Sequence, residues 1–394
     1  MQASPGQSST RTAGAALPAR RGRGLLQGLA VLAITLVLIA GLLEIALRLF
    51  APQIVPPISG LFGADPATGY RLQPGAVVPF RFAEGNTTFR INAQGLREDT
   101  ATGPPAVGVT RLLCLGDSFT FGMGVNADQA FPHLLNGKSA ANSERVESLN
   151  AGVFGYGTDN EAAWLRTYGW PLAPKVVLVG FFVGNDVKDV AAGIAKTTAT
   201  SDGRLVATGG ADAEADTGVP SGGLKGWLEH NSHAYLFARS LYYQVRPPAI
   251  KVQQPTLFDA ASFFLTAEPP DVAAGWTKTL AVLDAMQADT VAHGARLVVV
   301  VIPTREQVQP DDWAAMLRQF GLSEAQLTRD LPEQHLAAWG ARSGVAVIDL
   351  LPRMQAAGQT QRLYFRTDRH WNVAGHALAA QIIAEGLTAL GVLR

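Results

Sequence analysis

Four polar segments, far apart along the chain, contain the side chains that acyl transfer through a serine requires. A serine hydroxyl hardly ionises at neutral pH, so it needs a neighbouring base, a group that orients this base, and donors for the oxyanion that forms on attack. The sequence can supply all three. The segments are residues 116–122, 151–158, 184–186 and 365–372.

The first segment is the run Leu115-Gly116-Asp117-Ser118-Phe119, which continues an apolar stretch. We expect that stretch to be the first strand of a parallel sheet. Ser118 then lies at the carboxyl end of a strand and opens a helix, where its own backbone N–H is free to donate. Taken alone, a Gly-Asp-Ser tripeptide is also compatible with a serine that merely caps the following helix.

The next two segments stand at the ends of the next two expected strands. After Asn150 comes the Gly-rich turn 151–158, whose backbone can approach a ligand closely. After residues 176–182 comes the run 184–186, in which the carboxamide of Asn185 can donate to an oxyanion. In isolation, both segments are also typical of ordinary loops.

The fourth segment lies near the C-terminus, where Asp368 precedes His370 by two residues. A helical stretch, residues 373–390, follows. An imidazole near a helix start with a carboxylate beside it is what a general base and its orienting group require. A second interpretation makes Asp368, His370 and His376 metal ligands, but it offers three ligands at most and no further obvious partner. We therefore expect neither a metal nor a cofactor.

In this order, the four segments resemble the SGNH subgroup of the GDSL hydrolase superfamily, whose name records Ser, Gly, Asn and His in four sequence blocks. The resemblance covers about residues 90–394. It implies a catalytic triad and three oxyanion donors. The triad is Ser118, His370 and Asp368, and the donors are the backbone N–H groups of Ser118 and Gly155 and the side chain of Asn185.

Two features depart from the usual family pattern. The last block is often Asp-x-x-His, whereas a single residue separates Asp368 from His370, as in some extracytoplasmic polysaccharide acyltransferase-like relatives. In the second block, three glycines compete for the oxyanion role. They are Gly152, Gly155 and Gly157. The family pattern Asn-x-x-x-x-Gly, counted from Asn150, selects Gly155 and leaves Gly152 in reserve.

Five short apolar runs, separated by helical patterns, must position these segments. Strands that are apolar on both faces and alternate with helices indicate a parallel sheet covered on both sides. The runs are residues 111–115, 146–150, 176–183, 297–303 and 345–350. We therefore expect an α/β protein, a three-layer α/β/α sandwich with a central parallel sheet of about five strands. The resemblance implies the flavodoxin-like fold of SGNH hydrolases.

The main domain, residues 110–394, has a region of different composition before it. Residues 51–109 alternate Pro and Gly turns with short apolar runs, of which residues 88–97 are the most strand-like. We expect this lead-in region to pack on the main domain. Residues 91–97 also resemble a sequence common in bacterial membrane-anchored family members.

A second interruption is the predicted insertion, residues 191–275. Residues 191–223 have hardly any large apolar side chains and indicate a flexible loop, whereas residues 224–245 show aromatic and aliphatic residues at mixed helical spacing. An insertion at the carboxyl edge of a parallel sheet overhangs the ligand crevice, so it could be a lid or a substrate platform. The alternative is an ordinary packed helix pair under a loop.

An apolar segment near the N-terminus, residues 25–43, is long enough to span a bilayer, which needs about 20 residues. The arginines before it predict a cytoplasmic N-terminus, with everything after about residue 50 outside. The alternative is a cleaved signal peptide, but no clean small-x-small site follows. We expect residues 1–24 to be a disordered cytoplasmic tail and residues 25–49 an uncleaved anchor. An Ala-, Gly- and Arg-rich composition favours a bacterial inner membrane and a periplasmic domain.

Charge and cysteine content exclude other classes of protein. Lys and Arg total 32, as do Asp and Glu, so no net field attracts nucleic acid. The single cysteine, Cys114, excludes an internal disulfide framework and a cysteine metal cluster. Its apolar neighbours indicate a small buried side chain.

Three functional hypotheses follow from these patterns. The first is an extracytoplasmic serine esterase that cleaves O-acetyl or other short-chain acyl esters from a small ester or an acylated glycan. The second is an O-acyltransferase that uses the same triad with a sugar hydroxyl of an envelope polysaccharide in place of water. A single predicted span would require another protein to deliver the acyl donor, which favours the esterase. The third, a catalytically idle glycan-binding protein, is disfavoured because nucleophile, base and oxyanion positions are all present.

Overall fold

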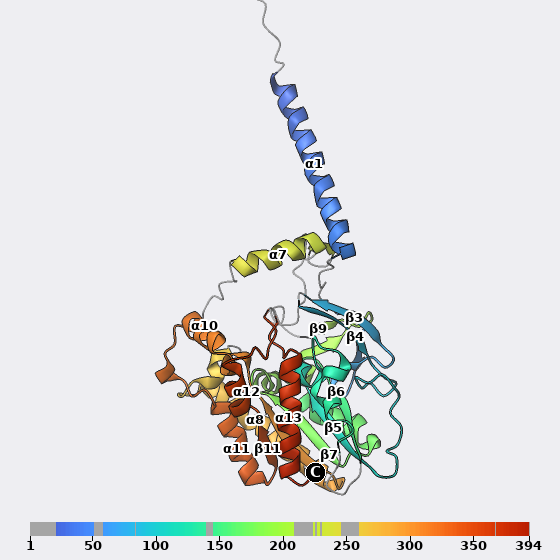
Figure 1. Cartoon of the computed structure of the whole chain (residues 1–394), viewed down its shortest axis with the longest axis vertical. Helices are drawn as coiled ribbons and strands as arrows, with labels where there is room; N and C mark the ends of the chain where they lie inside the picture. Colours follow the sequence, from blue (N-terminus) through green and yellow to red (C-terminus); the bar gives the residue numbers. More distant parts are fainter. Residues whose placement is uncertain are drawn as a thin grey trace, which may run out of the picture. The chain divides into compact units, whose positions relative to one another are not determined.

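The computed structural model divides the chain into two compact units, Met1–Pro52 and Gln53–Arg394 (Figure 1). The residues that it describes are 21–50, 58–82, 84–138, 145–208, 224, 227–228, 231–245, 260–366 and 368–393. In the first unit, the described residues form the helix α1 (Arg21–Phe50). Its segment Gln27–Phe50 is long and apolar enough to cross a membrane.

The predicted cytoplasmic tail, residues 1–24, falls mostly outside the described residues. Its last four residues already belong to α1, which begins at Arg21. Because arginine is a good helix former, the helix extends beyond the apolar segment into the basic residues before it. The apolar side chains of α1 are exposed over most of its length, as a helix in contact with lipid would require.

The second unit is built around a parallel sheet with the strand order β11-β10-β7-β5-β6. The strands are β5 (Val109–Gly116), β6 (Arg145–Gly152), β7 (Val176–Phe182), β10 (Arg296–Ile302) and β11 (Ala346–Asp349). Numbered along the chain, these strands follow the doubly wound order 2-1-3-4-5 of flavodoxin-like folds. All five predicted strands are confirmed.

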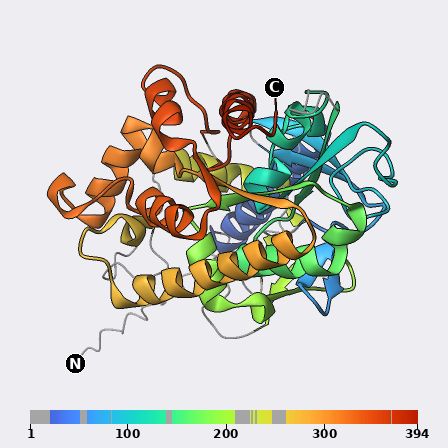
Figure 2. The ribbon, with the colours of Figure 1, turned by 90° about the horizontal axis from the view of Figure 1, so that it is seen from below.

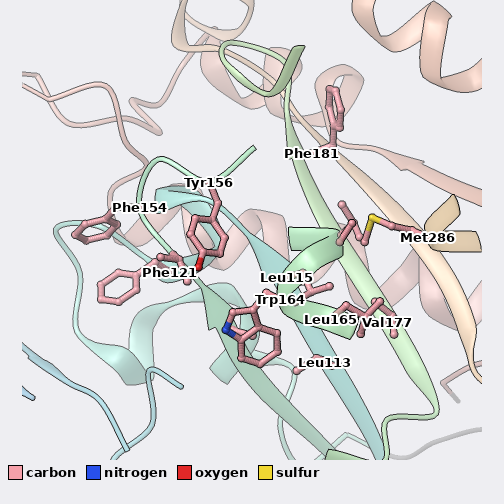
Figure 3. Packing of buried hydrophobic residues seen from close by; sticks show 14 of the residues in the cluster. Leu113, Leu115, Phe121, Phe154, Tyr156, Trp164, Leu165, Val177, Phe181 and Met286 are labelled. Atoms are coloured by element: carbon pink, nitrogen blue, oxygen red, sulfur yellow. The ribbon is translucent and has the colours of Figure 1, made fainter. Parts of the chain in front are cut away.

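Side chains of the strands alternate between two cores, because successive residues of a strand point to opposite faces. Leu113, Leu115 and Val177 belong to the first core, which Figure 3 shows together with Met286 of α8 (Pro270–Ala292). The helices α4 (Thr158–Trp164) and α11 (Leu331–Ser343) also contribute to this core.

The second core lies on the other face of the sheet and contains Leu112 and Cys114 of β5. It is covered by the helices α3 (Phe131–Leu134), α12 (Leu351–Gly358) and α13 (Val373–Ala389). Figure 2 shows α8 and α13 on opposite sides of the sheet. The predicted three-layer sandwich is thus confirmed, and Cys114 is fully buried, so that burial raises the pKa of its thiol to about 12.

The lead-in region forms two antiparallel hairpins, and its buried side chains join the first core. The strands are β1 (Phe62–Asp65) with β2 (Gly69–Leu72), and β3 (Val77–Phe82) with β4 (Gly85–Arg90). The strand expected over residues 88–97 therefore stops at Arg90. The chain turns there because the side-chain oxygen of Asn92 accepts hydrogen bonds from the backbone N–H groups of Gln94 and Leu96.

Within residues 191–275, the structure differs from the expected loop. Part of the segment 191–223 forms a hairpin of β8 (Thr197–Ala199) and β9 (Leu205–Ala207), while residues 209–223 lie outside the described residues. Backbone hydrogen bonds hold this hairpin together. Its small polar residues therefore gave no sequence pattern from which strands could be predicted. The threonine hydroxyl of Thr198 donates to the carbonyl of Gly69, which joins the hairpin to the lead-in region.

Helices bear on two further expectations for the insertion. The helical spacing expected over residues 224–245 corresponds to α7 (His233–Val245). At the other end, α8 already begins at Pro270, so the predicted boundary at residue 275 lies inside a helix of the main domain. Proline is common in the first turn of a helix, and it marks this start.

Candidate active site

Ser118 lies at the junction between β5 and the short helix α2 (Ser118–Phe121). The junction requires Gly116, whose φ is +152° and at which a Cβ would come within 2.0 Å of the Thr120 hydroxyl. The cap of α2 is Asp117, whose Oδ1 accepts the backbone N–H of Phe119 at 2.8 Å. Because Asp117 performs the capping, the Ser118 side chain is left for another role.

The carboxyl end of α2 is held by Arg97 of the lead-in region. This buried guanidinium donates to the carbonyls of Gly122 and Val125, both at 2.6 Å, and also to that of Phe121. Each of these carbonyls also accepts a longer hydrogen bond from another donor: the Asn150 side chain, the Val125 N–H or the Thr87 hydroxyl. The guanidinium adds a shorter, charge-assisted bond to each. Burial lowers the pKa of Arg97 to about 9, so the side chain stays cationic at neutral pH. The sequence drew attention to residues 91–97 as a family-like segment but did not predict that Arg97 binds the end of α2.

The structure brings Ser118, His370 and Asp368 into contact. The Nε2 atom of His370 lies 2.6 Å from the Ser118 Oγ, and its Nδ1 atom contacts the Asp368 Oδ1. The same carboxylate oxygen accepts the backbone N–H of His370 at 2.8 Å. The single intervening residue thus lets the carboxylate fold back on both the backbone and the ring of the histidine. With Nδ1–H bonded to the carboxylate, Nε2 is left to accept the serine proton.

The protonation of this pair follows from its mutual attraction. Burial by itself would raise the pKa of Asp368, but the charge of His370 and its hydrogen bonds outweigh burial and hold that pKa below its ordinary value. Burial would likewise lower the pKa of His370, but the Asp368 carboxylate, with a smaller contribution from Asp117, raises it overall. The imidazole is therefore a stronger base than an isolated histidine.

The loop that carries His370 is fixed by contacts on both sides. Before it, the Tyr364 hydroxyl donates to the carbonyl of Pro303 at 2.8 Å. Beside it, Arg369 forms an ion pair with Glu306 at 3.0 Å. After it, Asn372 caps α13, because its side chain accepts the backbone N–H of Gly375 at 3.0 Å.

The structure places His376 apart from the Ser118–His370 contact. It is fully buried, its Nδ1 accepts the backbone N–H of Phe131 at 3.4 Å, and its ring packs edge-on against Trp371. Burial lowers its pKa to about 3, with the Arg97 charge adding to the shift, so the ring is neutral. In the part of the chain that the structure describes, no group of three or more His, Cys, Asp and Glu side chains is placed to hold a metal ion.

Of the three glycines in the second block, Gly155 alone keeps an unengaged backbone N–H within the described residues. The N–H of Gly152 donates to the Asn150 side chain at 3.0 Å, and a Cβ at Gly152 would lie 2.2 Å from the backbone nitrogen of Phe121. Gly152 therefore allows α2 to pack closely on β6. The N–H of Gly157 donates to the Asn160 side chain.

Asn185 stands at the end of β7, before α5 (Asp186–Ala192). Its Nδ2 lies 3.4 Å from the Asp117 Oδ2, on the side of the site where Ser118 begins its helix. Ser118, Gly155 and Asn185 are each partly exposed, whereas Asp117 is fully buried. Hydrogen-bond donors that a substrate can reach, next to the buried Asp117, are suited to bind a substrate oxygen.

Sequence reasoning missed a group of buried acids behind the oxyanion donors. Glu161 in α4 is 1% exposed, and neither of its carboxylate oxygens has a hydrogen-bond partner among the described residues. Asp186 is fully buried and accepts the backbone N–H of Phe182 at 3.0 Å. Burial raises the pKa of both carboxyls well above the ordinary value, and repulsion adds to it, first from Asp117 for Glu161 and first from Glu161 for Asp186. Asp186 is the last residue of the third segment and Glu161 follows the second by three residues, but no sequence pattern indicates their burial.

Comparisons with known proteins relate part of the chain to a described family. Residues 257–393 match the family described as SGNH hydrolase-like domain, acetyltransferase AlgX. A probable alginate O-acetylase AlgJ of Pseudomonas syringae pv. tomato is 31% identical over 103 residues, which are 26% of this chain and 24% of that protein. A probable alginate O-acetylase AlgJ of Pseudomonas putida is 26% identical over 153 residues, 39% of this chain and 37% of that protein.

Among solved structures, a member of the lipolytic protein G-D-S-L family from Veillonella parvula aligns with 71% of this chain and 98% of its own, at 14% identity and a TM-score of 0.36. The alignments with the two AlgJ proteins span less than two fifths of the length of either protein.

The family match over residues 257–393 bears out the resemblance to SGNH hydrolases that the four segments predicted. Within this class, its curated relatives are named as O-acetylases, so the findings fit the acyltransferase hypothesis better than the esterase hypothesis. The family match includes Asp368 and His370. It begins at residue 257, so Ser118, Gly155 and Asn185 lie before it.

Proposed function

We propose that this protein is an extracytoplasmic O-acyltransferase, which moves an acetyl group through Ser118 onto a hydroxyl of an envelope polysaccharide. The observation that carries the proposal is the contact of Ser118 with His370, 2.6 Å from oxygen to nitrogen, with Asp368 on the other ring nitrogen. This arrangement is the triad of acyl transfer. The names of the relatives favour a sugar hydroxyl over water as the acceptor.

The first half-reaction forms an acyl-serine. His370 takes the Ser118 proton at Nε2 while Oγ attacks the carbonyl carbon of the acyl donor. The carbonyl oxygen becomes an oxyanion, which accepts hydrogen bonds from the Ser118 and Gly155 N–H groups and from the Asn185 side chain. When the oxyanion collapses, the bond to the leaving group breaks, and His370 returns its proton to that group.

The second half-reaction repeats these steps with the acceptor. A polysaccharide hydroxyl loses its proton to His370 and attacks the acyl carbon, the same donors stabilise the second oxyanion, and Ser118 leaves as the alcohol after protonation by His370. Asp368 stays ionised throughout, because the attraction of His370 keeps its pKa low. Transfer to water by the same route would be esterase activity, so the acceptor decides between the two enzymatic functions.

The apolar helix supports a location at a membrane. We propose that the segment Gln27–Phe50 anchors the protein, with its N-terminus in the cytoplasm and the SGNH domain outside. Among the described residues it is the only candidate span. The acyl donor must therefore already be outside the membrane or be presented there by another membrane protein, and the polysaccharide is the second partner.

The test uses the full-length protein in detergent. p-Nitrophenyl acetate serves as the acyl donor, and de-acetylated alginate or a neutral glucan serves as the acceptor. We expect polysaccharide to speed p-nitrophenol release and to carry new acetyl esters, measured by mass spectrometry of the sugar fragments. A Ser118→Ala variant should yield neither.

Two results would count against the proposal. If free acetate were the only acetyl product at every acceptor concentration, the protein would be an esterase. If Ser118→Ala matched the wild type, the site itself would be wrong.

A further inference from the structure

The proposed oxyanion donor that follows β6, the N–H of Gly155, belongs to a single rigid group, the peptide unit that joins Phe154 to Gly155. A trans peptide is planar, and its N–H points away from its C=O. Whatever holds the carbonyl of Phe154 therefore also sets the direction of the Gly155 N–H. Gly155 has a φ of +69°, so this turn adopts a conformation that the rest of the chain must maintain.

The carbonyl of Phe154 is held by a residue 84 positions earlier in the chain. The hydroxyl of Tyr70, in β2, donates to this carbonyl at 2.7 Å. A Cβ at Gly155 would lie 3.0 Å from the same hydroxyl oxygen, so the tyrosine sits directly against the turn. The hydrogen bond thus connects the lead-in region to the peptide unit that carries the oxyanion donor.

The Tyr70 side chain is fixed before any substrate arrives. Tyr70 is 1% exposed, and its ring packs edge-on against Phe62 and Tyr156, with centroids 5.7 and 5.3 Å away. Its backbone carbonyl accepts hydrogen bonds from the hydroxyls of Thr68, at 2.8 Å, and Tyr156. Figure 3 shows Tyr156 and Phe154 together in this part of the core.

The hydroxyl can act only as a donor toward the carbonyl. Burial raises the pKa of Tyr70 well above the ordinary value for tyrosine, and nearby negative groups add to the effect. The phenol therefore keeps its proton at neutral pH. Donation to a peptide carbonyl polarises the peptide and makes its N–H a better donor.

We propose that Tyr70 is a positioning residue of the oxyanion hole: through the carbonyl of Phe154, its hydroxyl aims and strengthens the N–H of Gly155. The inference rests on the proposed function, because it requires acyl transfer at Ser118. It assigns a role in the reaction to the lead-in region, from which the four motif segments are absent.

The test compares Tyr70→Phe with Tyr156→Phe in the full-length protein. Both variants keep the buried ring and remove one hydroxyl that donates to a backbone carbonyl. They differ in the carbonyl that is affected. Tyr156→Phe leaves the carbonyl of Tyr70 with its second donor, Thr68, and leaves the peptide unit of Gly155 bonded. Similar melting temperatures for the two variants would show that their folds are equally intact.

For Tyr70→Phe we expect kcat for p-nitrophenyl acetate to fall about tenfold, a part of the 10²–10³-fold effect of a whole oxyanion donor. We expect KM to change less than twofold and the pH profile to keep its shape, because His370 is untouched. Tyr156→Phe should stay within about twofold of the wild type. Equal losses of kcat in both variants, or a loss confined to KM, would overturn the inference.

A second variant covers the case in which Tyr70→Phe does not fold. Site-specific replacement of Tyr70 by 3-fluorotyrosine keeps the ring and makes the hydroxyl a stronger donor, so kcat should hold or rise. A fall in kcat would contradict the positioning role. Ser118→Ala is measured in parallel. If Ser118→Ala kept wild-type turnover, both the proposed function and this inference would be wrong. If turnover required Ser118 but Tyr70→Phe left kcat unchanged, only the inference would be wrong.

Discussion

The two halves of the candidate active site differ in how much backbone pairing holds them in place. In the nucleophile half, Ser118, Gly155 and Asn185 each follow a strand of the sheet. The register of the sheet pairs the end of β5 with the ends of its two neighbours, Gly116 with Gly152 and Gly116 with Gly180. Three separate segments therefore meet because the backbone pairing of the sheet brings them together.

In the base half, His370 follows no strand of the sheet, whose last strand, β11, ends at Asp349. The loop that carries the base is closed by one isolated antiparallel bridge, Tyr364 with Trp371, in which the Phe365 N–H donates to the His370 carbonyl at 3.0 Å. Side-chain contacts, among them the ion pair of Arg369 with Glu306, hold the rest. The family match nevertheless covers this half alone, residues 257–393. The family match thus identifies the base half, while the sheet geometry identifies the nucleophile half. The comparison predicts that the halves act as one unit in catalysis but differ in stability.

The largest effect should come from removing one group of each half. We expect Ser118→Ala and His370→Ala each to lower kcat at least about 10⁴-fold, and the double variant to lose little more, because residues of a triad act as a unit. The measurement is acylation by p-nitrophenyl acetate. A His370→Ala variant that kept more than a tenth of wild-type activity would show that the two halves do not act as one catalytic unit.

A somewhat smaller effect should follow from Asp368→Asn, for which we expect kcat to fall about 10³–10⁴-fold. His370 must be neutral to act as a base, and the Asp368 carboxylate raises its pKa above 6.5. Wild-type activity should therefore rise with pH through an apparent pKa above this value. In Asp368→Asn the rise should move to lower pH, which a pH–rate profile from about pH 5 to 9 would detect. A rise that moved to higher pH would contradict the assigned contact.

The oxyanion donor of the nucleophile half should rank third. Asn185→Ala should lower kcat about 10²–10³-fold and leave KM nearly unchanged, because the amide acts on the charge that develops during attack. Steady-state kinetics with a short-chain aryl ester would measure the effect. A loss that appeared mainly in KM would make Asn185 a residue of substrate binding instead.

The smallest effects concern stability and compare one arginine from each half. Arg97→Met removes three charge-assisted hydrogen bonds from the interior, although each carbonyl keeps a second donor, so the free energy of unfolding should fall by about 3 kcal/mol. Arg369→Ala removes a side chain that is 62% exposed, and the fall should be below about 1 kcal/mol. Urea unfolding of both variants measures the difference. Equal losses would mean that the base half depends on its surface contact as much as the nucleophile half depends on its buried one.

The sequence predicted the parts of the fold that repeat along the chain. The five strands were recognisable because each is a short run that is apolar on both faces, and the order of the four segments pointed to the residues that the structure brings together at the ends of β5, β6 and β7. The contacts of Tyr70 and Arg97 were not predictable, because a hydrogen bond to a distant carbonyl leaves no local pattern. The hairpin β8–β9 was missed for a similar reason, since its pairing is made by the backbone.

The burial of Cys114 makes the protein convenient for thiol chemistry. A thiol reacts through its thiolate, and a pKa of about 12 in the middle of β5 leaves almost none at neutral pH. Because the sequence has no other cysteine, a thiol reagent added to the folded protein should label almost nothing unless a new cysteine is introduced. A cysteine placed at the exposed position of Val291 would take a fluorophore or spin label selectively. Slow modification of Cys114 itself would in turn report the opening of the central sheet.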